Sequence, residues 1–123
     1  MAYLPEETVR QLFIHYCIDS GLCPAGRISV ERELEVLGMR RRYDLVLFDT
    51  SGLPWMLVEC KAPSVVLSQT AMEQIARYNL TLTVPYLLVT NGWSAFCYAI
   101  DFQAKSWRPL DRLPDQTPTD GVR

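Results

Sequence analysis

Residues 42–63 read RYDLVLFDTSGLPWMLVECKAP, two apolar runs separated by a polar turn. Both runs are short and rich in residue types that favour strands. The intervening residues 51–54 are Ser, Gly, Leu and Pro, a composition typical of turns. We therefore predict strands at residues 40–49 and 55–62 that pair as an antiparallel hairpin.

The register of this hairpin brings charged side chains together. If the turn is centred on Ser51 and Gly52, Asp44 lies directly opposite Glu59, with Cβ atoms about 5 Å apart. Glu59 and Lys61 then share one face of their strand, because alternate residues point the same way. Two adjacent carboxylates repel unless a cation lies between them, and Mg²⁺ or Mn²⁺ takes oxygen ligands of this kind. The hairpin thus predicts a divalent metal site beside a lysine, against the alternative of ordinary solvated strand residues.

A third carboxylate is suggested by the preceding strand, predicted at residues 28–37. A turn centred on Gly38 and Met39 would place Glu33 opposite Asp44. This candidate depends on two predicted registers, because a slip of one residue moves every side chain to the other face.

Two helices are predicted on either side of these three strands. The first spans residues 5–20, where Pro5 and two glutamates suit a helix start. The second spans residues 65–80, with Ser64 as its N-cap. In the second helix Gln74 and Tyr78 are four residues apart and therefore share one face.

The remaining sequence completes the predicted order α-βββ-α-ββ. Two more strands are expected at residues 84–90 and 94–102, around an Asn-Gly turn. This order is typical of an α/β (α+β) fold with one sheet and helices packed against it. We expect one domain over residues 1–108 and a flexible, proline-rich tail over residues 109–123.

Composition narrows the function classes. The 123 residues carry 12 basic and 14 acidic side chains, for a net charge of −2, which excludes a polycationic nucleic-acid binder. No apolar run is long enough for a membrane span, and no export leader is readable, so we expect a cytoplasmic protein. Four cysteines without CxxC spacing and a single histidine do not suit a zinc site; we expect four reduced thiols.

An ordered set of motifs resembles a known domain. Asp44 is followed by the E-x-K triplet of Glu59 and Lys61, and then by the Q-x-x-x-Y of Gln74 and Tyr78. Together with the run YLLVTNG at residues 86–92, these closely resemble the nuclease-like N-terminal domain of type I restriction enzyme R subunits, in a small stand-alone form. That family belongs to the PD-(D/E)xK nuclease superfamily, and the resemblance covers about residues 5–100.

The resemblance implies a central mixed sheet flanked by helices, and Mg²⁺-dependent (or Mn²⁺-dependent) hydrolysis of DNA phosphodiesters by an endonuclease. Asp44 and Glu59 would ligate the metal together with the carbonyl of Cys60. Lys61 would activate water and stabilise the charge of the transition state, and Gln74 would lie beside the metal and the DNA backbone.

Further residues are assigned less directly. Tyr78 of the Q-x-x-x-Y motif would contact the substrate, and Arg42, within an Arg40–Arg42 run, and Arg77 offer basic side chains for DNA. The superfamily often adds a glutamate of the first helix. Here that residue would be Glu7, or less favourably Glu6, which competes with Glu33 from the register argument.

The sequence also departs from the family. Tyr43 stands where the superfamily motif has proline, and no P-loop occurs in the 123 residues, so we expect no ATP site in this chain. Restriction activity would then need restriction-modification subunits or a homodimer. Three readings remain open: a metal-dependent DNA nuclease, a DNA-binding or interaction module that keeps the fold without turnover, and a structure-selective junction resolvase that works as a homodimer. The acidic residues, lysine and glutamine of the motifs favour the enzyme.

Overall fold

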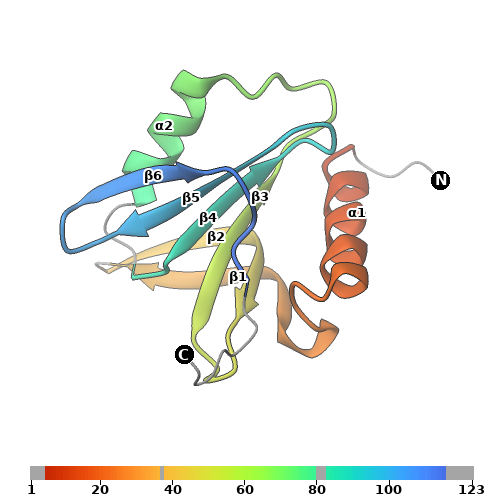
Figure 1. Ribbon diagram of the computed structural model, residues 1–123, viewed down its shortest axis with the longest axis horizontal. Coiled ribbons are helices and arrows are strands. Elements are labelled where there is room, and N and C mark those ends of the chain that lie inside the picture. The colour runs from red at the N-terminus through yellow and green to blue at the C-terminus, as the bar shows by residue number, and fades with distance from the viewer. Residues whose placement is uncertain (1–4, 37, 80–82, 116–123) are drawn as a thin grey trace.

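The computed structural model describes residues 5–36, 38–79 and 83–115, apart from the side chains of Val36, Met39 and Tyr78. Its centre is a six-stranded sheet in which each strand lies beside the next in chain order (Figure 1). Only β3 and β4 run parallel; the other neighbours are antiparallel. The strands are β1 (Ile28–Val36), β2 (Met39–Phe48), β3 (Pro54–Cys60), β4 (Tyr86–Thr90), β5 (Ala95–Asp101) and β6 (Ser106–Leu110).

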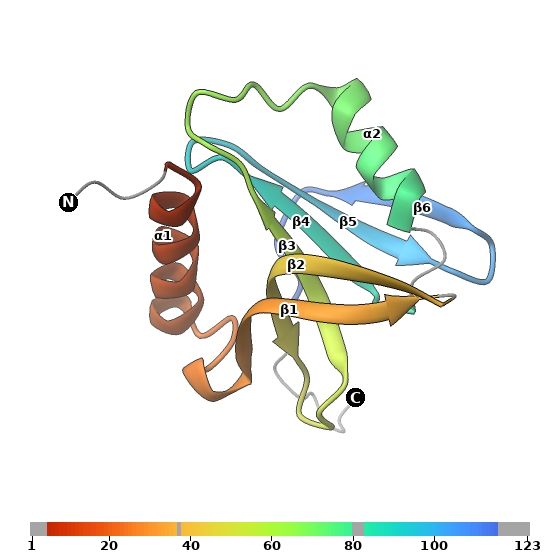
Figure 2. The same cartoon turned by 180° about the vertical axis from the view of Figure 1, so that it is seen from behind.

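One helix covers each face of the sheet (Figures 1 and 2). Helix α1 (Pro5–Ser20) packs through Val9, Phe13 and Cys17, which recur every four residues and are buried. Helix α2 (Gln69–Tyr78) connects the parallel strands β3 and β4 and packs on the other face. The sheet therefore separates two apolar clusters, and the predicted α/β (α+β) class with a mixed sheet and flanking helices is confirmed.

The predicted pairing of β2 with β3 is confirmed along the middle of the hairpin. Leu45 pairs with Val58, and the next two residues of β2 continue the same register. The turn is held by Asp49, whose carboxylate accepts hydrogen bonds from the N–H groups of Ser51 at 2.8 Å and Leu53 at 3.0 Å. Next to this turn the register differs from the predicted one, because it shifts between Leu47 and Phe48 and Phe48 pairs with Pro54 instead of Trp55.

The predicted pairing of β1 with β2 is wrong by two residues. Val36 pairs with Met39, so the turn lies one residue earlier than expected, with Gly38 at a φ of 79° that favours glycine. Glu33 consequently lies opposite Arg42 and not opposite Asp44. The third carboxylate that the register argument placed at the metal site is therefore not there.

Helix α2 also begins later than predicted. Ser68, not Ser64, is its N-cap, and the Ser68 hydroxyl accepts a hydrogen bond from the Ala71 N–H at 3.1 Å. Residues 63–68 instead form a loop that leads away from β3. The difference brings this loop, rather than a helix, to the side of Lys61.

A sixth strand was not predicted. Strand β6 pairs with β5 at the edge of the sheet and includes Pro109, which an edge strand tolerates because one of its sides makes no ladder bonds. The sheet thus extends to Leu110, beyond the expected domain limit at residue 108, and Leu113 packs on the α1-side cluster. Within the described residues, neither helix is long and apolar enough to cross a membrane. Residues 116–123 of the predicted tail lie outside the described residues.

Candidate functional site

Asp44 lies at the point where the pairing of β2 with β3 ends, one residue beyond the Leu45–Val58 pair. Its carboxylate oxygen Oδ2 accepts a hydrogen bond from the backbone N–H of Cys60 at 2.7 Å. This contact fixes the Asp44 side chain against the end of β3, next to Glu59. The two carboxylates that the sequence placed together are thus brought to one place by adjacent strands.

Glu59 is half-buried, and burial raises the pKa of its carboxyl above the ordinary value of 4.5. The Lys61 ammonium opposes this by lowering the pKa, Asp44 raises it, and Arg41 lowers it. Among the described side chains, none donates a hydrogen bond to the Glu59 carboxylate. A partly dehydrated carboxylate beside a second one is a suitable ligand pair for a divalent cation.

The raised pKa gives a testable pH dependence for the metal-free protein. A carboxyl with a raised pKa binds its proton more tightly in the folded state, so the free energy of unfolding should fall as pH rises through that pKa. We expect Glu59→Gln to remove this part of the fall, and to leave the unfolding free energy at low pH nearly unchanged. Urea unfolding of both proteins in EDTA, between about pH 4 and 8, measures the free energy of unfolding at each pH. If the unfolding free energies of wild type and Glu59→Gln changed with pH in the same way, a raised pKa at the half-buried Glu59 would be contradicted.

Lys61 and Gln74 line the same pocket, about 320 Å³ in volume, on the α2 side of the sheet. The backbone N–H of Lys61 donates to the carbonyl of Thr90 at 2.8 Å, which ties the end of β3 to the end of β4. The rest of the lining is apolar: Val65, Val66, Leu67, Ala71, Met72 and Ile75. The structure therefore brings together a lysine and a glutamine that are separated by a loop and one turn of helix. Tyr78 closes α2, and its side chain lies outside the described residues.

The basic residues chosen from the sequence lie elsewhere. Arg42 is 3.8 Å from each of Glu31 and Glu33, on the exposed surface of the β1–β2 hairpin. The Arg77 guanidinium lies over the ring of Trp107, 5.1 Å from its centroid. Arg41 is the member of the arginine run whose charge acts on Glu59. Strict strand alternation places Arg42, not Arg41, on the face of Asp44, so no signal in the sequence pointed to Arg41. Alternation is interrupted here, because Tyr43 and Leu45 pack in different apolar clusters.

The first helix contributes a second group of charges. Glu7 forms an ion pair with Arg10 and accepts a hydrogen bond from Gln11 at 2.8 Å. Both Glu7 and Arg10 act on the pKa of the buried Cys60 thiol, so the start of α1 faces the end of β3. Glu7 is therefore near the site but already paired, whereas Glu6 is exposed.

The donor set fits a hard cation only in part. No group of three or more His, Cys, Asp or Glu side chains within the described residues is arranged to hold a metal. Asp44 and Glu59 supply two carboxylates, which is the number that Mg²⁺ commonly takes while keeping water or phosphate as its other ligands. The Cys60 thiol does not suit this site, because Mg²⁺ takes oxygen ligands and the thiol packs in the apolar cluster on the α1 side. A contribution from Cys60 would have to come from its carbonyl.

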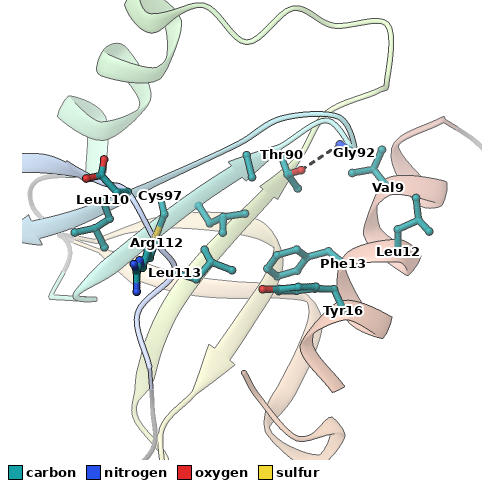
Figure 3. Close-up of a pocket in the computed structure, with 13 residues that line it drawn as sticks. Val9, Leu12, Phe13, Tyr16, Thr90, Gly92, Cys97, Leu110, Arg112 and Leu113 are labelled. Carbon is teal, nitrogen blue, oxygen red and sulfur yellow. Dashed lines mark hydrogen bonds between the residues drawn. The ribbon is translucent and has the colours of Figure 1, made fainter. Parts of the chain in front are cut away.

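A larger hollow of about 500 Å³ lies between α1 and the segment that follows β6 (Figure 3). Its walls are mainly apolar and include Leu12, Phe13 and Tyr16 of α1 and Leu110 and Leu113. None of the predicted site residues lines it. Size alone therefore does not identify the candidate site in this molecule.

Comparison with known proteins places this geometry in context. Residues 5–114 match the family described as type I restriction enzyme R protein N terminus. Four solved chains are similar. A fragment of a candidate HsdR subunit of a type I restriction enzyme from Vibrio vulnificus YJ016 has a TM-score of 0.62 and 19% identity over 92% of this chain. This chain corresponds to 24% of that Vibrio chain. No curated protein sequence matches.

Two further structures share the fold at low identity. A candidate nuclease of the DUF820 group from Anabaena variabilis ATCC 29413 has a TM-score of 0.56 and 12% identity over 91% of this chain and 70% of its own. The DrdV–DNA complex has a TM-score of 0.55 and 16% identity over 95% of this chain, but only 10% of the DrdV chain. At these identities the similarity establishes a nuclease-like fold.

Proposed function

Because the chain belongs to the family of type I restriction enzyme R protein N-terminal domains, we propose that it is a metal-dependent DNA endonuclease that acts in the cytoplasm. The observation that carries the proposal is the convergence of Asp44, Glu59 and Lys61 at the end of β3. Buried or half-buried charges of this kind are costly in a fold that does not use them. The DNA in the DrdV structure supports DNA as the substrate class.

Each residue has a defined task in this proposal. Asp44 and Glu59 would hold Mg²⁺ (or Mn²⁺), with the Cys60 carbonyl as a further ligand. The cation would polarise the scissile phosphate and lower the pKa of a bound water. Lys61 places a fixed ammonium where negative charge grows on the phosphate, which lowers the barrier because no solvent has to reorganise.

Gln74 and the arginines would position the DNA. The Gln74 amide lies on the wall of the pocket that contains Lys61, where it can donate to a phosphate oxygen or orient the attacking water. Arg77 lies over the Trp107 ring, and Arg42 lies 3.8 Å from each of two glutamates. Arg41 likewise lies over an aromatic ring, 5.6 Å from the centroid of Tyr43, but it is the arginine whose charge acts on Glu59. We therefore assign DNA contact first to Arg41, and a secondary role to Arg42, Arg77 and Tyr78.

A second candidate function is a DNA-binding or interaction module that works only with restriction-modification subunits or as a homodimer. It is favoured by the net charge of −2 and by the ion pairs that engage Arg10, Arg40 and Arg42. The chain also spans about a quarter of the Vibrio HsdR chain, so activities of the whole relative need not reside in it.

Cleavage assays distinguish the two candidates. Supercoiled, linear, single-stranded and branched DNA should be incubated with the purified protein in Mg²⁺, in Mn²⁺ and in EDTA. The nuclease proposal expects cutting in the two metals and none in EDTA. If calorimetry detects metal binding but no substrate is cut, the partner-dependent module replaces the enzyme.

A further inference from the structure

Two loops lie side by side at the end of the sheet that carries Lys61 (Figures 1 and 2). One is the loop over residues 63–68, and the other is the turn over residues 91–94 between β4 and β5. The Asn91 side-chain amide joins them by donating to the carbonyl of Val65 at 2.7 Å. Thr90, at the base of the turn, accepts the backbone N–H of Lys61. Both loops are therefore tied directly to the candidate site.

These loops present apolar side chains to solvent. Trp93 is 83% exposed and Val66 is 84% exposed, while Val65 is also exposed. An indole in this position gains little from the protein core, and together with Val65 and Val66 it forms an exposed apolar surface on the two joined loops, the kind of surface that marks a contact with a partner. Trp93 is separated from Thr90 by three positions, which limits the distance between their Cα atoms to about 11 Å.

The turn fixes the backbone that carries Trp93. Asn91 is buried, and its Oδ1 accepts the N–H groups of Trp93 at 2.9 Å and Ser94 at 2.8 Å. The Thr90 hydroxyl oxygen accepts the Gly92 N–H at 3.1 Å (Figure 3). Gly92 has a φ of 93° and lies close to Val9 of α1, so the turn also packs against the first helix. Because the turn is already ordered, a base that stacks on the indole does not have to order this backbone on binding.

The charge of the molecule favours stacking as the source of affinity. Neutralisation of phosphates by basic residues is weak here, since the net charge is −2 and Arg10, Arg40 and Arg42 are in ion pairs. Stacking of a base on an aromatic ring requires no positive charge and tolerates any base. It requires only that the base be unpaired and accessible.

We propose that Trp93 stacks on an unpaired nucleobase adjacent to the phosphate held at Lys61, so that the site acts on single-stranded or locally unpaired DNA. The identity of the ligand as DNA rests on the function proposed above. Stacking itself is a property of the turn and does not need the metal. It can therefore be measured separately from cleavage.

The test is DNA binding in EDTA by wild type, Trp93→Ala and Trp93→Phe. The probes are a labelled single-stranded oligonucleotide and the duplex of the same sequence, both followed by fluorescence anisotropy. We expect Trp93→Ala to weaken single-strand binding by about five- to a hundredfold, and Trp93→Phe to keep most of the affinity. Duplex binding should change by less than about twofold, because paired bases present no free face.

Two controls sharpen this result. Leu53→Ala removes another exposed apolar side chain, at the β2–β3 turn at the opposite end of the sheet, and should leave both affinities unchanged (Figure 1). Single-stranded DNA should also quench the tryptophan emission of wild type, and Trp93→Phe should abolish that quenching. Trp55, which is buried, and Trp107, under Arg77, remain as references in every variant.

The outcomes separate this inference from the proposed nuclease. Three results would overturn the stacking role. Trp93→Ala could bind single-stranded DNA as tightly as wild type does, it could lose affinity equally for both probes, or wild type could fail to bind single-stranded DNA. In the first case Trp93 would instead serve a protein contact. A selective loss of single-strand binding in a protein that cuts no DNA would support stacking and overturn only the nuclease.

Discussion

Replacing Lys61 by alanine is expected to lower metal-dependent DNA cleavage at least about a hundredfold, the usual cost of removing one group that stabilises transition-state charge. The effect should be on the rate and not on metal loading, because the ammonium is near the Glu59 carboxylate without being a metal ligand. Initial cleavage rates at saturating Mg²⁺, with calorimetry of Mg²⁺ binding, measure both quantities.

The chain offers a matched control for this experiment. Lys105, the only other lysine, lies exposed in the β5–β6 turn, far along the chain from the site. Lys105→Ala changes the net charge equally, so it should reproduce any general loss of DNA attraction without the loss of rate. Unchanged cleavage in Lys61→Ala, or an equal loss in Lys105→Ala, would remove Lys61 from the mechanism.

Replacing Asp44 by asparagine should abolish Mg²⁺ binding and cleavage while preserving or raising the stability of the metal-free protein. The asparagine carbonyl can still accept the Cys60 N–H, and the repulsion between the Asp44 and Glu59 carboxylates disappears. Asp44→Ala, by contrast, leaves that N–H without its acceptor and should lower the free energy of unfolding by about 1–3 kcal/mol. Calorimetry and urea unfolding in EDTA test the two variants together.

Asp101 provides the comparison for Asp44. Its carboxylate accepts the N–H groups of Gln103 at 3.1 Å and Ala104 at 3.0 Å, so it has a similar backbone-capping role away from the site. Asp101→Asn should bind Mg²⁺ and cut DNA as wild type does. A metal-free Asp44→Asn that is clearly less stable than wild type would contradict the shared position of the two carboxylates.

Local signals in the sequence were sufficient to predict the register along the middle of the β2–β3 hairpin, but not the register of the β1–β2 hairpin. The β2–β3 turn is capped by the side chain of Asp49, and its apolar runs fix which face is buried, so Asp44 and Glu59 could be placed together. Strand β1 and the first residues of β2 are mostly exposed and charged, so no buried face selects the register next to the turn. There Val36 pairs with Met39, Gly38 in the turn has a positive φ, and Glu33 lies opposite Arg42 instead of Asp44.

Sequence alone determined the order of the first five strands and two helices, the family, and the carboxylate–lysine group at the end of β3, because these depend on periodicity, turn chemistry and motif spacing over short ranges. Tertiary structure decided which segments lie around that group. The charge of Arg41 acts on Glu59, and the Asn91–Val65 hydrogen bond joins the turn that carries Trp93 to the loop that follows Lys61. Those choices arise from strand twist and from contacts between segments far apart in the chain, which no local pattern encodes.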